Sequence, residues 1–322
     1  MANLEAREFL SRIGIQRIQE LDTALIEAFG LEEGEKHIKN LTELFDQAEM
    51  RLIYGVKESD VSAALAASGF SRNSSLRGRV HKKTNPCLRR QSELVDYLNQ
   101  DLSLSLLASS YYDRIFFQKT IDYLIRADRF FRGSICEVGC GNGILTCFLA
   151  QRYPDSAVTG LDLSANAISV AKVLKERHSI HNAAFYQQDI ADMDMAGQKQ
   201  KQFQALLSCR TVHENVAWPP LAAKQSKKSN PENETGLRQL SPARLTALHG
   251  PYAQALANLI NPGGYLISVE RYEADDSYNG LLQALEKAGF SREKGTHERF
   301  SCKNGDEAAT FQAIVFKRSS LQ

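Results

Sequence analysis

Three glycines at alternate positions constrain the fold of this 322-residue chain more than any other feature. Gly139, Gly141 and Gly143 follow the apolar run 135–138, and residues 144–152 then have the composition of a helix. Because glycine lacks a Cβ and tolerates positive φ, such a loop lets the backbone pass very close to a ligand. The sequence therefore predicts a strand, a ligand-binding loop and a helix, the first unit of an α/β domain.

The spacing of these glycines excludes two common nucleotide-binding loops. A dinucleotide-binding loop has the pattern Gly-x-Gly-x-x-Gly, which would require glycine at the position that Ile144 occupies. A phosphate-cradling P-loop ends in Gly-Lys-Ser or Gly-Lys-Thr, and neither follows here. We therefore expect a ligand that makes no demand for a phosphate-binding lysine.

Apolar runs that end in acids follow the loop in the order of a doubly wound sheet. Residues 157–163 contain Asp162 near their end, and residues 184–190 contain Asp189. In such folds an acid about 20 residues beyond the loop accepts hydrogen bonds from ribose hydroxyls, which is the role predicted for Asp162. Further strands are predicted at 203–208, 265–269 and 310–316, and helices at 165–177, 242–259 and 281–288.

The acid at 137 and the glycines at 139, 141 and 143 resemble Glu/Asp-x-Gly-x-Gly-x-Gly, the first motif of class I S-adenosylmethionine-dependent methyltransferases. The resemblance covers roughly residues 91–317. It implies an α/β, Rossmann-like sheet, mostly parallel with an antiparallel last strand, and S-adenosylmethionine as the cofactor. The cofactor-binding residues that it implies are Glu137, Gly139, Gly141, Gly143, Asp162, Leu163, Asp189, Ile190 and Ser208. Asp189 is expected to contact the exocyclic amine of adenine, with Leu163 and Ile190 flanking the ring.

Residues after the fourth predicted strand are candidates for catalysis. Methyl transfer is an in-line displacement, so the protein must align donor and acceptor and remove any proton that the acceptor carries. His213 is the predicted general base, although a structural histidine is an equal interpretation, and Glu214 is a second candidate base. Arg210 is a candidate for binding an acceptor carboxylate. Trp218 either walls the acceptor pocket or only anchors its loop.

Tyr111 and Tyr112 precede the first predicted strand, in a segment that we expect to be helical. Many members of the family place a tyrosine there to cover the methionine end of the cofactor, so the resemblance makes both residues candidates for the substrate site. Two adjacent tyrosines on an amphipathic helix can also simply pack. The sequence leaves both interpretations open.

The first ninety residues differ in kind from the rest. Between Phe9 and Phe45, apolar residues recur at three- and four-residue spacing, which indicates amphipathic helices, and a further short helix is predicted before Gly69. We expect an all-helical domain at 1–90 that covers the substrate pocket or forms a homodimer. A methyltransferase domain at 91–322 follows it.

Two polar stretches interrupt this arrangement. Residues 71–92 carry seven arginines and lysines and no acid, which fits either a solvated linker or a surface for an anionic partner such as RNA. Residues 224–239 contain almost no apolar side chains. They fit either a lid over the acceptor or an inert surface insertion.

Composition sets limits on location and partners. The formal net charge of +1 creates no global attraction to nucleic acid or membrane, so a nucleic-acid partner is not expected. No apolar run approaches the ~20 residues of a membrane span, and the N-terminus has no signal-peptide core. The six cysteines form no Cys-x-x-Cys pair and no zinc-type spacing, so no metal is expected. These features predict a cytoplasmic protein with no membrane contact.

Absent motifs narrow the acceptor. After the fourth strand the chain lacks Asn-Pro-Pro-Tyr and Asp-Pro-Pro-Tyr, with which adenine and glutamine methyltransferases grip a planar amide or amine. The paired glutamates of protein arginine methyltransferases are represented only by Glu214. The sequence thus predicts methyl transfer to an O, N or C atom of a small metabolite. The alternatives are an RNA or protein methyltransferase that uses residues 71–92, and a non-catalytic, methyltransferase-like binding subunit.

Overall fold

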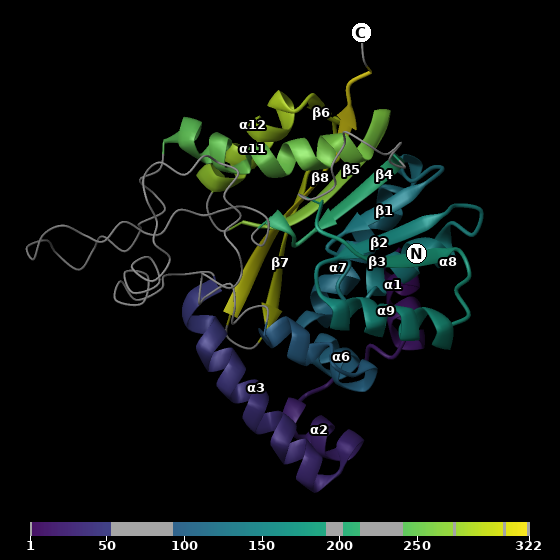
Figure 1. Ribbon diagram of the computed structural model, residues 1–322, viewed down its shortest axis with the longest axis vertical. Coiled ribbons are helices and arrows are strands. Elements are labelled where there is room, and N and C mark those ends of the chain that lie inside the picture. Colours follow the sequence, from purple (N-terminus) through teal and green to yellow (C-terminus); the bar gives the residue numbers. More distant parts are fainter. Residues whose placement is uncertain are drawn as a thin grey trace, which may run out of the picture.

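The computed structural model describes residues 2–52, 93–190, 202–212, 241–272, 275–304 and 307–320. Strands of this described part form one sheet in the order β3-β2-β1-β4-β5-β8-β6, with β7 also paired to β8 (Figure 1). The strands are β1 (Ile135–Val138), β2 (Val158–Asp162), β3 (Ala183–Gln187), β4 (Phe203–Cys209), β5 (Ile260–Arg271), β6 (Phe290–Arg292), β7 (Glu298–Asn304) and β8 (Glu307–Arg318).

The pairing of the strands confirms the predicted fold class. Strands β1 to β5 pair in parallel, whereas β8 runs antiparallel to β5. The sequence did not predict β6 and β7. Both pair antiparallel to β8, and β6 has only three residues, too few to show a period along the sequence.

Helices cover both faces of the sheet. They are α6 (Leu102–Ala108), α7 (Arg114–Arg126), α8 (Ile144–Arg152), α9 (Ala165–Arg177), α11 (Pro242–Leu259) and α12 (Asp275–Lys287), with a π-helical turn η1 (Ser109–Asp113) and a 3-10 turn η2 (Asp128–Phe130). The predicted bounds of α8, α9 and α11 are confirmed, and α12 begins six residues earlier than predicted. Figure 1 shows α11 and α12 on one side of the sheet and α8 and α9 on the other.

Side chains along the central strands alternate between two cores. Ile135 and Leu207 point into the core that α7, α8 and α9 cover, whereas Cys136 and Leu206 belong to the core under α11 and α12. All four side chains are fully buried. A parallel sheet buried on both faces explains why these strands read as continuous apolar runs.

The N-terminal residues form the three amphipathic helices that the sequence predicts, α1 (Ala2–Arg12), α2 (Leu21–Phe29) and α3 (Leu31–Leu52). Helix α1 packs on the sheet core, where the rings of Phe9 and Phe148 meet edge to face at 5.2 Å. Glu5 of α1 also pairs with Arg152 of α8. Helix α1 is therefore continuous with the core on this face.

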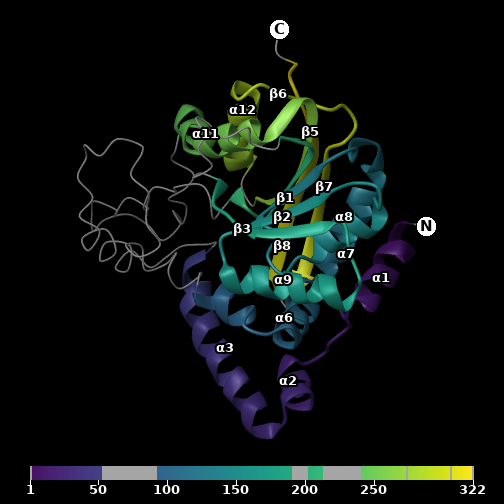
Figure 2. The same ribbon diagram turned by 45° about the vertical axis from the view of Figure 1, so that its right-hand side comes forward.

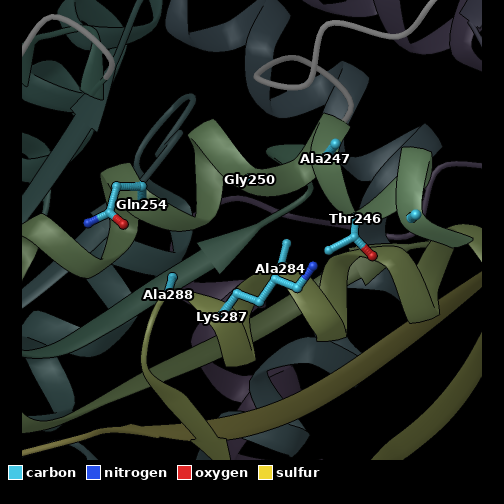
Figure 3. Close-up of a pocket in the computed structure, with 8 residues that line it drawn as sticks. Thr246, Ala247, Gly250, Gln254, Ala284, Lys287 and Ala288 are labelled. Carbon is cyan, nitrogen blue, oxygen red and sulfur yellow. The ribbon is translucent and has the colours of Figure 1, made fainter.

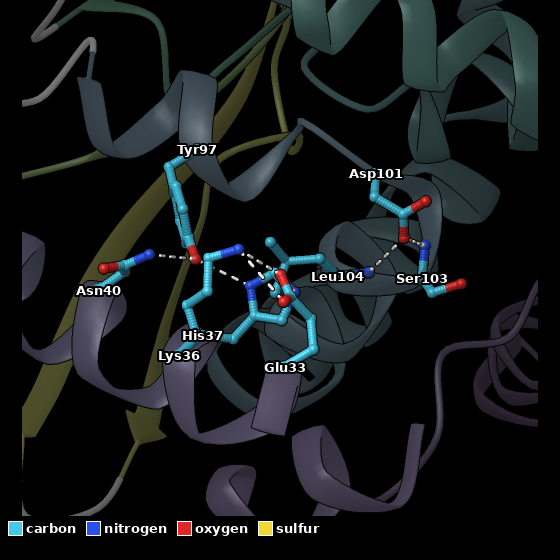
Figure 4. A network of polar contacts seen from close by, with 8 residues as sticks. All are labelled: Glu33, Lys36, His37, Asn40, Tyr97, Asp101, Ser103 and Leu104. Atoms are coloured by element: carbon cyan, nitrogen blue, oxygen red, sulfur yellow. Dashed lines mark hydrogen bonds and ion pairs between the residues drawn. The ribbon is translucent and has the colours of Figure 1, made fainter. Parts of the chain in front are cut away.

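Helices α2 and α3 form a hairpin that packs beside α6 (Figure 2). Their shared apolar cluster contains Leu25 and Leu41 from the hairpin and Leu104 from α6. Figure 4 shows the polar contacts that join α3 to the helical residues 93–98: the Tyr97 hydroxyl lies 2.8 Å from Nδ1 of His37 and accepts a bond from Asn40 at 3.1 Å. These contacts fix the hairpin against the helices that lead into the sheet.

Several predicted segments lie outside the described residues. They are the short helix before Gly69, the basic stretch 71–92 and the polar insertion 224–239. Within the described part of the chain, every helix is too short or too polar to cross a membrane.

The packing of α1 gives the first prediction. Phe9 is 2% exposed and contacts Phe148, so Phe9→Ala should lower the free energy of unfolding by about 3 kcal/mol, measured by urea denaturation. Leu4→Ala on the same helix is the matched control, because Leu4 is 62% exposed. Equal losses in the two variants would mean that α1 does not contribute to the core.

Candidate functional site

The glycine loop joins β1 to α8 at the carboxyl edge of the parallel strands. Gly139, Gly141 and Gly143 all have positive φ, at 68°, 51° and 81°. A Cβ on Gly139 would collide with Cγ2 of Thr211, and one on Gly143 would lie 2.7 Å from Cβ of Ala171. A Cβ on Gly141 would meet no atom within 4 Å. The fold itself therefore requires Gly139 and Gly143, whereas Gly141 faces open space where a ligand can approach the backbone.

Asp162, at the end of β2, is aimed at this loop. Its carboxylate oxygens accept hydrogen bonds from the backbone N–H groups of Gly141 and Ser164, each with an N···O distance of 2.8 Å. Two backbone donors leave part of the acceptor capacity of a carboxylate unused, because its two oxygens offer about four lone-pair sites. Asp162 is thus oriented beside Gly141 with capacity for ligand hydroxyls, as the sequence predicts.

Glu137, the acid before the glycines, lies beneath the loop. It is 2% exposed, and its carboxyl accepts the hydroxyl of Thr146 in the first turn of α8. Burial raises the pKa of this carboxyl to about 8. Its contact in the structure is with the helix that follows the loop.

Asn142 is a loop residue that sequence reasoning missed. Its Nδ2 donates to the hydroxyls of Ser105 and Ser109, both at 3.0 Å, and so ties the loop to α6 and η1. The only signal was a polar side chain between two glycines of the motif. Its partners lie more than thirty positions earlier, where no pattern announces them.

The ends of β2 and β3 bring together the residues predicted to hold adenine. The Gln188 N–H donates to the Asp162 carbonyl at 2.9 Å, and the Gln187 side chain donates to the Leu163 carbonyl at 3.1 Å. Asp189 and Ile190 follow directly, and Ile190 is buried. Leu163 and Asp189 are therefore placed at neighbouring strand ends.

Ser208, predicted to bind the cofactor, lies at the end of β4 with 1% of its surface exposed. Its hydroxyl donates to the carboxylate of Glu270 at 2.5 Å and lies 2.6 Å from the hydroxyl of Tyr252. The side chain of Ser208 is thus committed to a buried polar network on β5 and α11. Glu270 and Tyr252 were not predicted from the sequence.

Arg210 begins the turn after β4 and is one of two described non-glycine residues with positive φ, at 58°. Its guanidinium pairs with Asp113 of η1 at 2.6 Å and lies over the ring of Phe116, 5.0 Å from its centre. The arginine side chain is 45% exposed. The position predicted for carboxylate binding thus holds a carboxylate of the chain itself.

Tyr111 and Tyr112 belong to η1, with their rings edge to face at 4.8 Å. Both are partly buried against the cluster of α2, α3 and α6. Tyr112 also lines a cavity of about 200 Å³ together with Leu25 and Leu41. The two tyrosines therefore belong to the turn that Asn142 contacts and pack it against the N-terminal hairpin.

Other predicted residues fall outside this assembly. His213, Glu214 and Trp218 lie outside the described residues. A cavity of about 270 Å³ between α11 and α12, lined by residues such as Thr246, Gln254 and Lys287, includes no residue of the glycine loop (Figure 3). Among the described residues no cluster of histidines, cysteines and acids could hold a metal ion.

Buried Glu137 predicts how stability depends on pH. Its pKa is about 8 in the folded chain against an ordinary value of 4.5, so between these values the folded chain binds more protons than the unfolded one. The free energy of unfolding should therefore fall as pH rises across this window. Glu137→Gln should flatten the fall between about pH 5 and about pH 8 in urea denaturation.

The exposed carboxyl of Glu298 supplies the control for this measurement. Glu298→Gln removes a carboxyl that is 40% exposed and paired with Arg126, and should leave the pH dependence in this window intact. An unchanged slope in Glu137→Gln would contradict the assignment of a protonated, buried carboxyl.

Comparison with solved structures finds similar methyltransferases at low sequence identity. Magnesium protoporphyrin IX methyltransferase from Synechocystis PCC 6803 with bound SAH is 16% identical, with a TM-score of 0.45 over 71% of this chain and 99% of that chain. Its structure with bound SAM is 20% identical, with a TM-score of 0.42 over 64% of this chain and 81% of that chain.

Curated relatives match only short segments. A malonyl-[acyl-carrier protein] O-methyltransferase from Priestia megaterium is 43% identical over 49 residues, 15% of this chain and 18% of that protein. A fatty-acid O-methyltransferase from Mycolicibacterium smegmatis is 33% identical over 79 residues, 24% of this chain and 27% of that protein. The chain thus matches less than a third of the length of either relative.

Residues 132–286 match a family model described as a methyltransferase domain. That segment contains the glycine loop, Asp162 and the strands β1 to β5. The antiparallel β8 beside β5 completes the sheet that the resemblance implies. Residues 132–286 therefore form a methyltransferase domain, and its sheet has the form that the resemblance to class I S-adenosylmethionine-dependent methyltransferases implies.

Proposed function

We propose that this chain transfers the methyl group of S-adenosylmethionine to an O, N or C atom of a small molecule. The observation that carries the proposal is the open space at Gly141 beside the oriented carboxylate of Asp162. A ligand that contains a ribose can place the ribose hydroxyls against Asp162. The rest of the ligand can then lie over the backbone of Gly141. The bound cofactor supplies an electrophilic methyl group on a sulfonium.

The residues around the loop fit that cofactor in charge as well as in shape. Asp162 is oriented by hydrogen bonds from two backbone N–H groups, and it would bind the ribose hydroxyls. Asp189 would accept from the amine of adenine, with Leu163 and Ile190 against the ring. Glu137 stays beneath the loop and holds the helix α8 through Thr146. These roles need no phosphate-binding cation, in agreement with the glycine spacing.

For the acceptor we favour a molecule with a carboxyl or acyl group. The Arg210 guanidinium holds the Asp113 carboxylate at 2.6 Å and is still 45% exposed, so an acceptor carboxylate would share this guanidinium with Asp113 or displace it. The two curated relatives cited above are named as O-methyltransferases of malonyl-[acyl-carrier protein] and of fatty acids. A carboxylate held beside the turn after β4 would lie at the edge of the sheet where open α/β folds bind their substrates.

Calorimetric titration with S-adenosylmethionine and S-adenosylhomocysteine tests the cofactor assignment. The chain should bind both, and Asp162→Ala should weaken binding by roughly 10- to 100-fold, because it removes charge-assisted hydrogen bonds. Asp155→Ala is the control, since Asp155 is exposed before the opposite end of β2. Absence of binding to the unmodified chain, or tight binding of NAD instead, would overturn the proposal.

The glycine loop offers a second, internally matched test. Gly141→Ala should cost only about 1 kcal/mol of stability for positive φ, yet weaken S-adenosylmethionine binding by at least roughly tenfold, because the methyl group enters the ligand's space. Gly143→Ala should destabilise the fold more, because its Cβ would lie 2.7 Å from Ala171. Thermal unfolding and calorimetry of both variants separate the two effects. Normal affinity in Gly141→Ala would mean that the ligand does not pass over this residue.

A further inference from the structure

Four polar side chains lie buried behind the turn that follows β4. Ser208 ends β4, Thr211 belongs to the turn, Tyr252 comes from α11 and Glu270 from β5. None of the four is more than 3% exposed. A buried polar group of this size is costly unless its members satisfy one another, so its contacts call for an explanation.

Glu270 is the acceptor on which the group converges. Its Oε1 accepts the hydroxyl of Ser208 at 2.5 Å and that of Thr211 at 3.3 Å, while its Oε2 accepts the N–H of Val212 at 3.2 Å. The hydroxyl of Tyr252 lies 2.6 Å from Ser208 Oγ and also bonds to the hydroxyl of Thr211. A single carboxyl therefore holds the end of β4 and the backbone of the turn at once.

The turn that Glu270 holds has a backbone that costs energy to maintain. Arg210 has φ of 58°, a left-handed conformation that costs a non-glycine residue on the order of 1 kcal/mol. The N–H of Arg210 donates to the Val269 carbonyl at 3.0 Å, directly before Glu270 in the chain. Such strain persists where the surrounding contacts over-determine it, which is what these bonds do.

The opposite side of the same turn touches the cofactor loop. The methyl group of Thr211 fills the position that a Cβ on Gly139 would need. Thr211 is thus held from behind by Glu270 and rests in front on the first glycine of the loop. Any shift of the turn away from Glu270 would therefore change the contact between Thr211 and the cofactor loop.

We infer that Glu270 is a positioning residue that holds the turn 210–212 against the glycine loop and so sets the acceptor side of the site relative to the cofactor. The inference rests on the proposed methyl transfer only for its consequence in catalysis. The holding contact itself is a property of the fold. In-line transfer needs donor and acceptor aligned within a fraction of an ångström, so a residue that fixes this distance matters without touching either.

Changing the pH changes the ionisation of Glu270 and so tests this role. Burial raises the pKa of its carboxyl to about 7. The titratable groups that face it are Cys209 on β4, Tyr252 on α11, Tyr272 after β5 and Tyr278 on α12. Burial raises the pKa of each of them further above neutrality, so they stay uncharged where Glu270 titrates. Gln312 on β8 lies opposite Glu270 in the strand register, and its side chain does not ionise.

The sign of the pH effect follows from the bonding. The ionised carboxylate can accept from Ser208, Thr211 and the Val212 N–H together, whereas the protonated form must use one oxygen as a donor. We therefore expect affinity for S-adenosylhomocysteine to rise as pH increases through about 7 in the unmodified chain. In Glu270→Gln this rise should be absent, because the amide does not titrate.

The experiment compares the unmodified chain, Glu270→Gln and the exposed control Glu298→Gln. Calorimetry with S-adenosylhomocysteine between about pH 6 and about pH 8.5 gives the pH profile, and hydrogen exchange gives the protection of the segment 203–212. Glu270→Gln should exchange roughly tenfold faster in this segment, because the amide has one acceptor oxygen where the carboxylate has two, with little change in the other strands. Its affinity for S-adenosylhomocysteine near pH 8 should fall by a similar factor.

The outcomes separate the two proposals. Unchanged protection of 203–212 and an unchanged pH profile in Glu270→Gln would overturn the positioning role, and faster exchange throughout the chain would make Glu270 only a structural residue. If the unmodified chain bound no S-adenosylhomocysteine, the proposed function would fail while the exchange result still decided the holding contact. Should Glu270→Gln not fold, Tyr252→Phe removes one hydroxyl of the group, and the same local increase in exchange is expected of it.

Discussion

The close packing of neighbouring side chains against the backbone of the glycine loop is the constraint on which the site depends. On one side of the loop, the turn after β4 contacts Gly139. On the other side, Ala171 of α9 and Phe185 of β3 lie against Gly143. Only Gly141 faces open space, and the carboxylate of Asp162 fixes that residue by its N–H. The three glycines thus have two different functions. The outer two let the fold close, and the middle one leaves room for a ligand.

Two buried acids stand on either side of this loop, and both reduce stability at neutral and higher pH. Glu137 holds α8 from beneath the loop, and Glu270 holds the turn from behind. Burial raises the pKa of both carboxyls, so the stability of the fold falls as each of them ionises. Their hydrogen bonds fix helix α8 and the turn after β4 on the two sides of the glycine loop. Positioning of the site is therefore obtained at a cost in stability, as is common at functional sites.

Sequence reasoning predicted most of the sheet, because parallel strands buried on both faces read as apolar runs between helices of regular period. The bounds of α8 and α9 and the position of Asp162 followed from local pattern alone. The missed features join residues distant in sequence. Ser208 and Glu270 are 62 positions apart, and Asn142 is 37 positions from Ser105. No local sequence pattern predicts such partners, and β6 is too short to show a period of apolar residues.

The turn η1 links the glycine loop to the turn after β4. At one end of η1, the Ser109 hydroxyl accepts a hydrogen bond from the side chain of Asn142 in the glycine loop. At the other end, Asp113 forms an ion pair with Arg210 in the turn after β4. Between them, Tyr112 packs against the hairpin of α2 and α3. A π-helical turn is an unfavourable local geometry that often marks a functional site. Because η1 contacts both the glycine loop and the turn after β4, a displacement of the N-terminal hairpin would be transmitted to both segments at once.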